Sequence, residues 1–303
     1  MKELYPMRGV ITTVNTPFNE DLTINWSDLR RTAEAALEAG VSGFLAPCFA
    51  SEIDELTNEE RYRMVTELLA VTHQAGHGIV MPNVRGKTKD DCVEQAKRYL
   101  DLGVDGVNIF MPTVTEESYR ELVAAVDELH PPFLCLQDTK DNELRAPFVK
   151  SMFDEFESFR CIKIETANPG PDYSAILKAT DGRLNVSGSW GSDQMIEAFD
   201  RGIHALMPSG LFELFVNVYR LYHEKSREAA MKLFFDILPI IVFTRQSDSA
   251  NLSLHKRYFQ RLGLYTTTKF RAPFAVDAVQ AHYIEEMIDR ALYIRDHMDN
   301  YWK

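Results

Sequence analysis

One lysine in the sequence has the surroundings expected of a reactive amine. Lys163 lies in the run Arg160-Cys161-Ile162-Lys163-Ile164-Glu165. Side chains alternate along a strand, so Cys161, Lys163 and Glu165 share one face and the two isoleucines share the other. A lysine that is withdrawn from water loses its proton more readily, and the free amine can form a Schiff base with a ketone. The alternative is a strand with a solvated face, on which Lys163 and Glu165 have no catalytic role.

Two carboxylates could transfer protons beside such an amine. We expect Asp138 and Glu165 at the carboxyl ends of strands, where a carboxylate can act as a general acid or base. Either could instead cap a helix or lie in solvent. Gln137 could donate a hydrogen bond to a substrate oxygen, or it could satisfy the backbone of its own loop. Cys48 ends an apolar run without an identifiable histidine base, so we expect it to pack in the core.

Short apolar runs alternate with longer amphipathic segments along most of the chain. The runs predict eight strands, at residues 9–14, 42–47, 78–84, 106–111, 132–136, 160–164, 184–188 and 202–208. The amphipathic segments predict helices at residues 26–39, 58–75, 90–102, 117–129, 147–156, 173–179 and 192–201. Eight such units favour a closed parallel barrel, in which catalytic groups project from the carboxyl ends of the strands. We therefore predict an α/β fold, a (β/α)8 TIM barrel.

The pattern changes to helices alone after about residue 211. Apolar residues recur at helical spacing in residues 231–243, 253–262 and 276–297. No linker rich in Gly, Pro or Ser precedes them, which indicates that these helices pack on the barrel. We predict a barrel over residues 1–224 and a C-terminal helical extension over residues 225–303.

Composition limits the partners and the compartment. The chain of 303 residues has 33 Lys and Arg against 45 Asp and Glu, a net charge of −12, which argues against nucleic acid and anionic membranes. The four cysteines have the spacing of buried, reduced thiols. The amino terminus lacks the apolar core of a signal peptide and no run is long enough to span a bilayer, so we expect a cytoplasmic protein. No histidine pair has metal-ligand spacing, and we expect neither a metal nor a cofactor.

Several short motifs follow one another in a distinctive order. They are Asn15-Thr16-Pro17-Phe18 after the first predicted strand, Ser51-Glu52 after the second, Ile162-Lys163, Ser187-Gly188-Ser189, and Leu262-Gly263-Leu264 with Thr266, Arg271 and Pro273. Together they resemble the dihydrodipicolinate synthase / N-acetylneuraminate lyase family over nearly the whole chain. That resemblance implies a pyruvate-handling class I lyase on a (β/α)8 barrel, with Lys163 as the Schiff-base lysine. It also implies a homo-oligomer, a tetramer or a dimer.

The sequence departs from the family pattern at four places. Cys48-Phe49-Ala50-Ser51-Glu52 stands where the family usually has G-T-T-G-E, and Cys135-Leu136-Gln137-Asp138 stands where it has Y-N-x-P. Pro112-Thr113-Val114 stands where a neighbouring subunit commonly lends a tyrosine, and no arginine matches near residues 140–142. These losses remove the hydroxyls of the family's proton relay. They argue against the synthase activity of the diaminopimelate pathway.

Other groups could still serve a 2-oxo acid. We expect the backbone N–H groups of Phe49, Ala50 and Ser51 to hold its carboxylate, since such donors do not depend on the side chain. The resemblance also predicts substrate contacts at Gly188 and Leu206, on the seventh and eighth strands.

The leading hypothesis is a lyase, aldolase or dehydratase that acts on pyruvate or a 2-oxo (sugar) acid through Lys163, with Asp138 or Glu165 in place of the missing tyrosine. One alternative is a degenerate family member that binds a keto acid or sugar acid without turnover. Another is acid–base chemistry on Asp138 and Glu165, in which Lys163 only stabilises an oxyanion.

Overall fold

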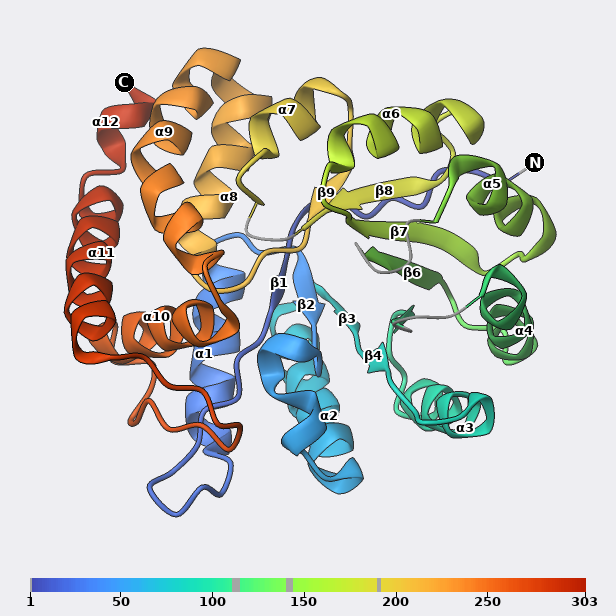
Figure 1. The fold of residues 1–303 in the computed structure, drawn as a ribbon, viewed down its shortest axis with the longest axis horizontal. Helices are drawn as coiled ribbons and strands as arrows, with labels where there is room; N and C mark the ends of the chain where they lie inside the picture. The colour runs from blue at the N-terminus through green and yellow to red at the C-terminus, as the bar shows by residue number, and fades with distance from the viewer. Residues whose placement is uncertain (1, 111–114, 140–143, 190–191) are drawn as a thin grey trace.

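The computed structural model describes residues 2–110, 115–139, 144–189 and 192–303 (Figure 1). Within these residues nine parallel strands form one sheet: β1 (Gly9–Thr13), β2 (Gly43–Leu45), β3 (Ile79–Met81), β4 (Asn83–Val84), β5 (Val107–Ile109), β6 (Leu134–Thr139), β7 (Phe159–Glu165), β8 (Asn185–Gly188) and β9 (Ala205–Leu206). Hydrogen-bonded neighbours follow the order β3-β2-β1-β9-β8-β7-β6-β5-β4. Because only Pro82 separates β3 from β4, these two segments share one position, and the sheet closes into a barrel.

Helices surround the strands and alternate with them along the chain (Figure 1). They are α1 (Trp26–Glu38), α2 (Asn58–Ala75), α3 (Lys89–Asp101), α4 (Glu116–Asp127), α5 (Ala146–Glu155), α6 (Pro169–Ala179), α7 (Met195–Asp200) and α8 (Phe212–Arg220). Local sequence fixes several of their ends. At α2, Thr57 and Glu60 form a reciprocal capping box, with Oγ1 of Thr57 3.2 Å from the N–H of Glu60. The predicted (β/α)8 TIM barrel is confirmed.

Alternation of side chains along the strands divides the core in two. Ile162 and Ile164 of β7 pack in the layer between the strands and the helices. Cys161 packs inside the barrel with residues such as Ile11 and Leu45. The face of β7 that carries Lys163 is therefore the interior face, as the positions of the two isoleucines predict.

A helical extension follows the barrel. A short helical segment, η4 (Leu221–Lys225), continues α8, and Ser226 then caps α9 (Arg227–Thr244). The remaining helices are α10 (Asp248–Arg261), α11 (Ala278–Asp296) and α12 (Asp299–Trp302). Helix α9 packs against α7 and α8, and α10 and α11 pack against α9. In Figure 1 the extension lies beside α1 and α8.

The four cysteines are free and buried, as predicted. None of the described helices combines the length and the apolar character that crossing a membrane requires.

Candidate active site

Lys163 lies inside the barrel near the carboxyl end of β7. Its neighbours across the sheet are Gln137 of β6 and Ser187 of β8. The residue is only 5% exposed, and its Nζ lies 3.2 Å from Oε1 of Glu165. The amine is thus buried but has a carboxylate beside it, a pairing that lowers the free-energy cost of burying the charge.

A chain of amides holds the Glu165 carboxylate in place. Nε2 of Gln137 donates to Oε2 of Glu165. Nδ2 of Asn108 donates to Oε1 of Gln137 at 3.0 Å and also to Oδ1 of Asn83. The chain crosses the barrel interior from β4 through β5 and β6 to β7. Because Gln137 binds one oxygen of Glu165, the other oxygen remains beside Lys163.

A cavity of about 590 Å³ opens at the same end of the barrel, where (β/α)8 enzymes have their active sites. The predicted residues that line it are Lys163, Glu165, Gln137, Phe49 and Ala50. The structure therefore brings the candidate lysine, one of its two candidate carboxylates and part of the predicted carboxylate-binding loop into one space. Such a volume is ordinary for a small-molecule site.

The loop after β2 forms the short helix η1 (Phe49–Ser51). Ser51 is turned away from the cavity: its hydroxyl donates to the carbonyl oxygen of Val14 at 2.5 Å and accepts from the N–H of Cys48. Its own N–H donates to the carbonyl oxygen of Cys48 at 2.9 Å. Of the three predicted residues of this loop, Phe49 and Ala50 line the cavity.

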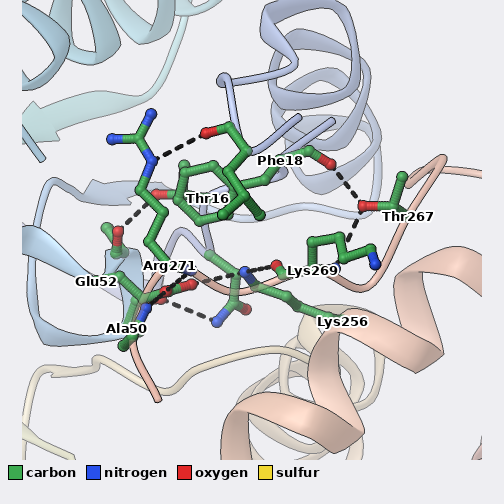
Figure 2. Close-up of polar contacts among 12 residues, drawn as sticks. Thr16, Phe18, Ala50, Glu52, Lys256, Thr267, Lys269 and Arg271 are labelled. Carbon is green, nitrogen blue, oxygen red and sulfur yellow. Dashed lines mark hydrogen bonds and ion pairs between the residues drawn. The ribbon is translucent and has the colours of Figure 1, made fainter. Parts of the chain in front are cut away.

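A buried ion pair anchors this loop to the extension (Figure 2). Nζ of Lys256, on α10, lies 2.6 Å from Oε1 of Glu52, and neither side chain is exposed to solvent. Burial lowers the pKa of Lys256, and the Glu52 carboxylate offsets part of that shift. The other oxygen of Glu52 accepts from the N–H groups of Arg271 and Ala272, both at 2.9 Å.

Neighbouring contacts extend the same anchor (Figure 2). The hydroxyl of Thr16 donates to the carbonyl oxygen of Ser51 at 2.6 Å, and Thr267 donates to that of Phe18 at 2.5 Å. The Arg271 guanidinium binds both oxygens of Glu60 at 2.7 Å. The chain segment after α10 therefore fixes the loop that carries Phe49 and Ala50.

Besides Ser51, three predicted site residues lie outside the cavity lining. Asp138 is on the opposite face of β6 from Gln137, and its Oδ1 accepts from the N–H of Leu144, which precedes α5, at 2.8 Å. Leu206 packs in the layer between strands and helices. Gly188 is covered by Tyr173, whose hydroxyl oxygen lies 2.8 Å from the position that a Cβ would take.

At β8 and β9 the cavity is lined by residues that come after the predicted Gly188 and Leu206, among them Ser189, Met207 and Ser209. A shift of one residue moves a side chain to the other face of a strand.

The thiols of Cys48 and Cys135 lie near Lys163, and burial keeps both protonated. Cys48 lines the cavity, and burial raises its pKa, although the Lys163 charge opposes that shift. Burial likewise raises the pKa of Cys135 to about 12. Both groups are therefore neutral thiols near pH 7, in agreement with the core-packing interpretation of Cys48.

Several lining residues could not be found from sequence motifs. Thr13 donates to the hydroxyl of Ser209 at 2.6 Å, which links β1 to the turn after β9. Asn251 and His255 come from α10. No motif distinguishes them from the polar face of an ordinary helix. The positions at Pro112-Thr113-Val114, residues 140–142 and Trp190, which also entered the sequence predictions, lie outside the described residues.

Known proteins resemble the chain in sequence and in fold. Residues 6–129 match the model of the Dihydrodipicolinate synthetase family. An uncharacterized DapA-like lyase of Halobacterium salinarum is 26% identical over 237 residues, which are 74% of this chain and 75% of the relative.

Two solved structures share the fold over almost their whole length. The dihydrodipicolinate synthase of Acinetobacter baumannii complexed with pyruvate has a TM-score of 0.84 at 17% identity, over 94% of this chain and 98% of that one. A catalytic lysine mutant of the sialic acid aldolase of Ruminococcus gnavus has a TM-score of 0.87 at 15% identity, over 98% and 99%.

The fold shared with these structures is a (β/α)8 barrel with C-terminal helices. The matches confirm the resemblance predicted from the sequence: residues 6–129 match the family's model, and the described chain shares the fold of a dihydrodipicolinate synthase and of a sialic acid aldolase.

Proposed function

We propose that the protein is a class I lyase that forms a Schiff base between Lys163 and the carbonyl carbon of a 2-oxo acid. The observation that supports this best is the position of the amine, which is buried, lines a cavity of about 590 Å³ and lies 3.2 Å from the Glu165 carboxylate. The match of residues 6–129 to the Dihydrodipicolinate synthetase family supports it, as does the fold shared with a sialic acid aldolase whose solved structure is that of a catalytic lysine mutant.

In the proposed reaction the amine attacks the carbonyl carbon, and the carbinolamine loses water to give an iminium. The iminium accepts the electron pair released when a proton leaves C3 or when the bond from C3 to C4 breaks. Glu165 takes the proton from C3, or from the C4 hydroxyl during cleavage, and can return it to C3 of the enamine. The N–H groups of Phe49 and Ala50 hold the carboxylate.

The test is borohydride trapping with pyruvate, followed by intact mass spectrometry. We expect the wild-type chain to gain the mass of one pyruvate less one oxygen atom, and Lys163→Ala to gain nothing. Lys178→Ala, which removes an exposed lysine from α6, is the matched control and should trap pyruvate normally. The proposal fails if the wild type forms no adduct or if Lys163→Ala forms the same adduct.

One observation favours a second candidate, binding without turnover. The cavity lining includes no tyrosine among the residues that the structure describes, so the phenol of the family's proton relay has no replacement there. Exchange of the pyruvate methyl protons in D₂O, followed by NMR, separates the two candidates, because exchange requires the enamine. An adduct without exchange supports binding alone, whereas exchange that Lys163→Ala abolishes supports the lyase.

We further propose that the partner is a free small molecule and that the protein works as a homo-oligomer in the cytoplasm. The four buried, unpaired thiols fit a reducing compartment. The net charge of −12 disfavours polyanionic partners.

A further inference from the structure

Three amide side chains lie inside the barrel next to the proposed reaction centre. Asn83, Asn108 and Gln137 come from β4, β5 and β6, and all three are buried. Their neighbours along the strands, Val84 and Ile109 among them, pack toward the helices, so the amides face the interior. The interior of such a barrel is ordinarily filled by bulky apolar side chains. A row of amides there needs an explanation other than packing.

The register of the strands aligns this row with Glu165. Asn83 and Asn108 are partners across β4 and β5. Gln137 lies two residues beyond the partner of Asn108 on β6, and Glu165 lies two residues beyond the partner of Gln137 on β7. From Asn108 to Glu165, each step therefore crosses one strand and moves two residues toward the carboxyl end of the barrel. The row ends at the cavity, which Gln137 and Glu165 line.

The charge of Glu165 determines which way each amide points. An ionised carboxylate only accepts hydrogen bonds, so Gln137 must turn its Nε2 toward Glu165, as it does. Its Oε1 then needs a donor on the other side, which Nδ2 of Asn108 supplies at 3.0 Å. The second hydrogen of that Nδ2 goes to Oδ1 of Asn83. From Asn108 the hydrogen bonds therefore run in one direction, through Gln137 to Oε2 of Glu165.

Asn108 lacks a hydrogen bond that a purely structural asparagine would make. Both hydrogens of its Nδ2 are engaged in the row, and its Oδ1 is buried without a partner among the described residues. An unpaired buried acceptor costs folding free energy, and buried polar groups of folded proteins are nearly always paired. Asn108 is also 0% exposed, so it cannot touch a substrate. Any role in the reaction must be exerted through its two amide partners.

We infer that Asn108 is a positioning residue for the proposed reaction, which acts through Gln137 on Glu165. Asn108 holds Oε1 of Gln137 and thereby keeps Nε2 of that amide on Oε2 of Glu165. Oε1 of Glu165 then lies beside Lys163 and is the oxygen that takes the proton from C3 of the Schiff base. The electron pair of the C3–H bond passes to the iminium, and the enamine forms. As a statement about the reaction, this rests on the proposed function.

Removal of the two donors tests the inference. Asn108→Leu should slow exchange of the pyruvate methyl protons in D₂O by about tenfold, the loss expected for one hydrogen bond that orients the base. The pyruvate concentration for half-maximal borohydride trapping should change less than about twofold, because the amine and the loop after β2 are unaltered. A role in packing alone would lower the melting temperature and leave the exchange rate of the folded protein unchanged. Asn108→Ala, which adds no bulk, serves if the leucine variant does not fold.

The matched control is Asn185→Leu. Asn185 is also an interior asparagine at 0% exposure, and its Nδ2 also donates twice, to the carbonyl oxygens of Tyr5 and Met7. These partners belong to the segment before β1, away from Glu165. The control variant should lower the melting temperature without slowing exchange. Slower exchange in this variant, to the same extent as in Asn108→Leu, would overturn the inference.

A double variant tests whether Asn108 acts through Gln137. Gln137→Met removes the donor to Glu165 and should slow exchange by itself. Addition of Asn108→Leu should slow it no further, because residues that act in series are not additive. An additive loss would contradict an action of Asn108 through Gln137.

Crystal structures of the same variants give a readout that needs no reaction. In Asn108→Leu the amide of Gln137 should rotate, and the Glu165 carboxylate should leave its place 3.2 Å from Nζ of Lys163. In Asn185→Leu the carboxylate should stay. A carboxylate that stays in Asn108→Leu overturns the inference, whether or not the protein is active.

The outcomes separate this inference from the proposed function. Slower exchange with normal trapping in Asn108→Leu supports both. Exchange at the wild-type rate in that variant overturns the positioning role and leaves the lyase function intact. If the wild type forms no adduct but the carboxylate moves in the variant, Asn108 positions the pair of Lys163 and Glu165, and the Schiff-base function fails.

Discussion

At the scale of single residues, the two oxygens of the Glu165 carboxylate have different partners. One lies 3.2 Å from the Lys163 amine, and the other accepts from the Gln137 amide. The amide contact limits rotation of the carboxylate, so its free energy of reorganisation during a proton transfer is small. Asp138, one residue beyond Gln137, lies on the other face of the strand and accepts from the N–H of Leu144. Only Glu165 of the two candidate carboxylates lines the cavity.

This difference predicts how the two carboxylates respond to the same substitution. Glu165→Gln should slow Schiff-base formation and C3 proton exchange by about 10²–10⁴-fold, the usual contribution of a general acid–base group. Asp138→Asn keeps an oxygen that can accept from Leu144 and should change both rates less than about threefold. Rapid-quench borohydride trapping and NMR exchange measure them. Equal losses in the two variants would contradict the assignment of proton transfer to Glu165.

At the scale of elements, the loop that carries Phe49 and Ala50 depends on a contact from the other end of the chain. Glu52 and Lys256 are both fully buried, so neither charge can be solvated if its partner is lost. A buried pair of this kind contributes less than its attraction suggests, yet removal of one member is costly.

Lys256→Met should therefore destabilise the protein by about 3–5 kcal/mol, because it leaves the Glu52 charge buried without a counterion. The double variant Glu52→Leu with Lys256→Met should recover much of this loss. Chemical denaturation measures both. Glu52 directly follows η1, so the double variant should also need a higher pyruvate concentration for half-maximal trapping, even where its stability recovers. Unchanged trapping would show that the ion pair does not position the loop.

A buried histidine between β8 and β9 makes the free energy of unfolding depend on pH. Burial lowers the pKa of His204 to about 4, and its Nδ1 accepts from the N–H of Val186 at 2.9 Å. Between pH 6.5 and about 4 the unfolded chain binds a proton at this site and the folded chain does not, so the free energy of unfolding falls as the pH falls.

The expected slope is about 1.4 kcal/mol per pH unit for this one group, and His255, whose pKa burial also lowers, adds to it in the same direction. Denaturation midpoints at pH 7, 5.5 and 4.5 give the slope. His204→Asn keeps an acceptor for Val186 without the titration and should flatten the profile. An equally steep profile in that variant would assign the acid sensitivity to other groups.

The sequence predicted most of the elements but not all of their limits. Apolar alternation predicted the limits of β7 to within one residue at each end, because Ile162 and Ile164 pack against the surrounding helices. β6 continues through Gln137 to Thr139, three residues beyond the prediction, because pairing with β7 is a tertiary interaction that polar residues do not signal. Pro82 divides one predicted strand into β3 and β4 because it has no N–H for the ladder.

The same reasoning explains which site residues were found. Strand alternation and the order of the motifs place the predicted residues at one end of the barrel. Those that line the cavity are Lys163, Glu165, Gln137, Phe49 and Ala50. Asn251 and His255 were not predicted. Helical periodicity indicates which face of α10 is buried, but not which part of the barrel that face covers.

At the scale of the whole molecule, the extension has an inner and an outer role. Its inner side lines the cavity and anchors the loop after β2. Its outer side leaves large apolar side chains in solvent: Phe235 and Val242, seven residues apart on α9, are 56% and 52% exposed, and Tyr283 of α11 is 41% exposed. The spacing places the first two on one stripe, and the ring of Tyr283 lies 5.2 Å from that of Phe243.

This outer face predicts contact with a second copy of the chain. Contiguous apolar groups on a surface favour association, and the family resemblance implies a homo-oligomer. Light scattering should give a mass above that of one chain at micromolar concentration. Phe235→Glu with Val242→Glu should shift the assembly toward smaller species, because two charges at the centre of an apolar contact lose solvation without gaining a partner.

Leu102→Glu, which changes a 38% exposed leucine beside α3, is the matched control and should leave the mass unchanged. A wild type that is monomeric at every concentration, or a double variant with an unaltered assembly, would place the subunit contact elsewhere or exclude it; a smaller assembly that still traps pyruvate would show that the cavity is complete within one chain.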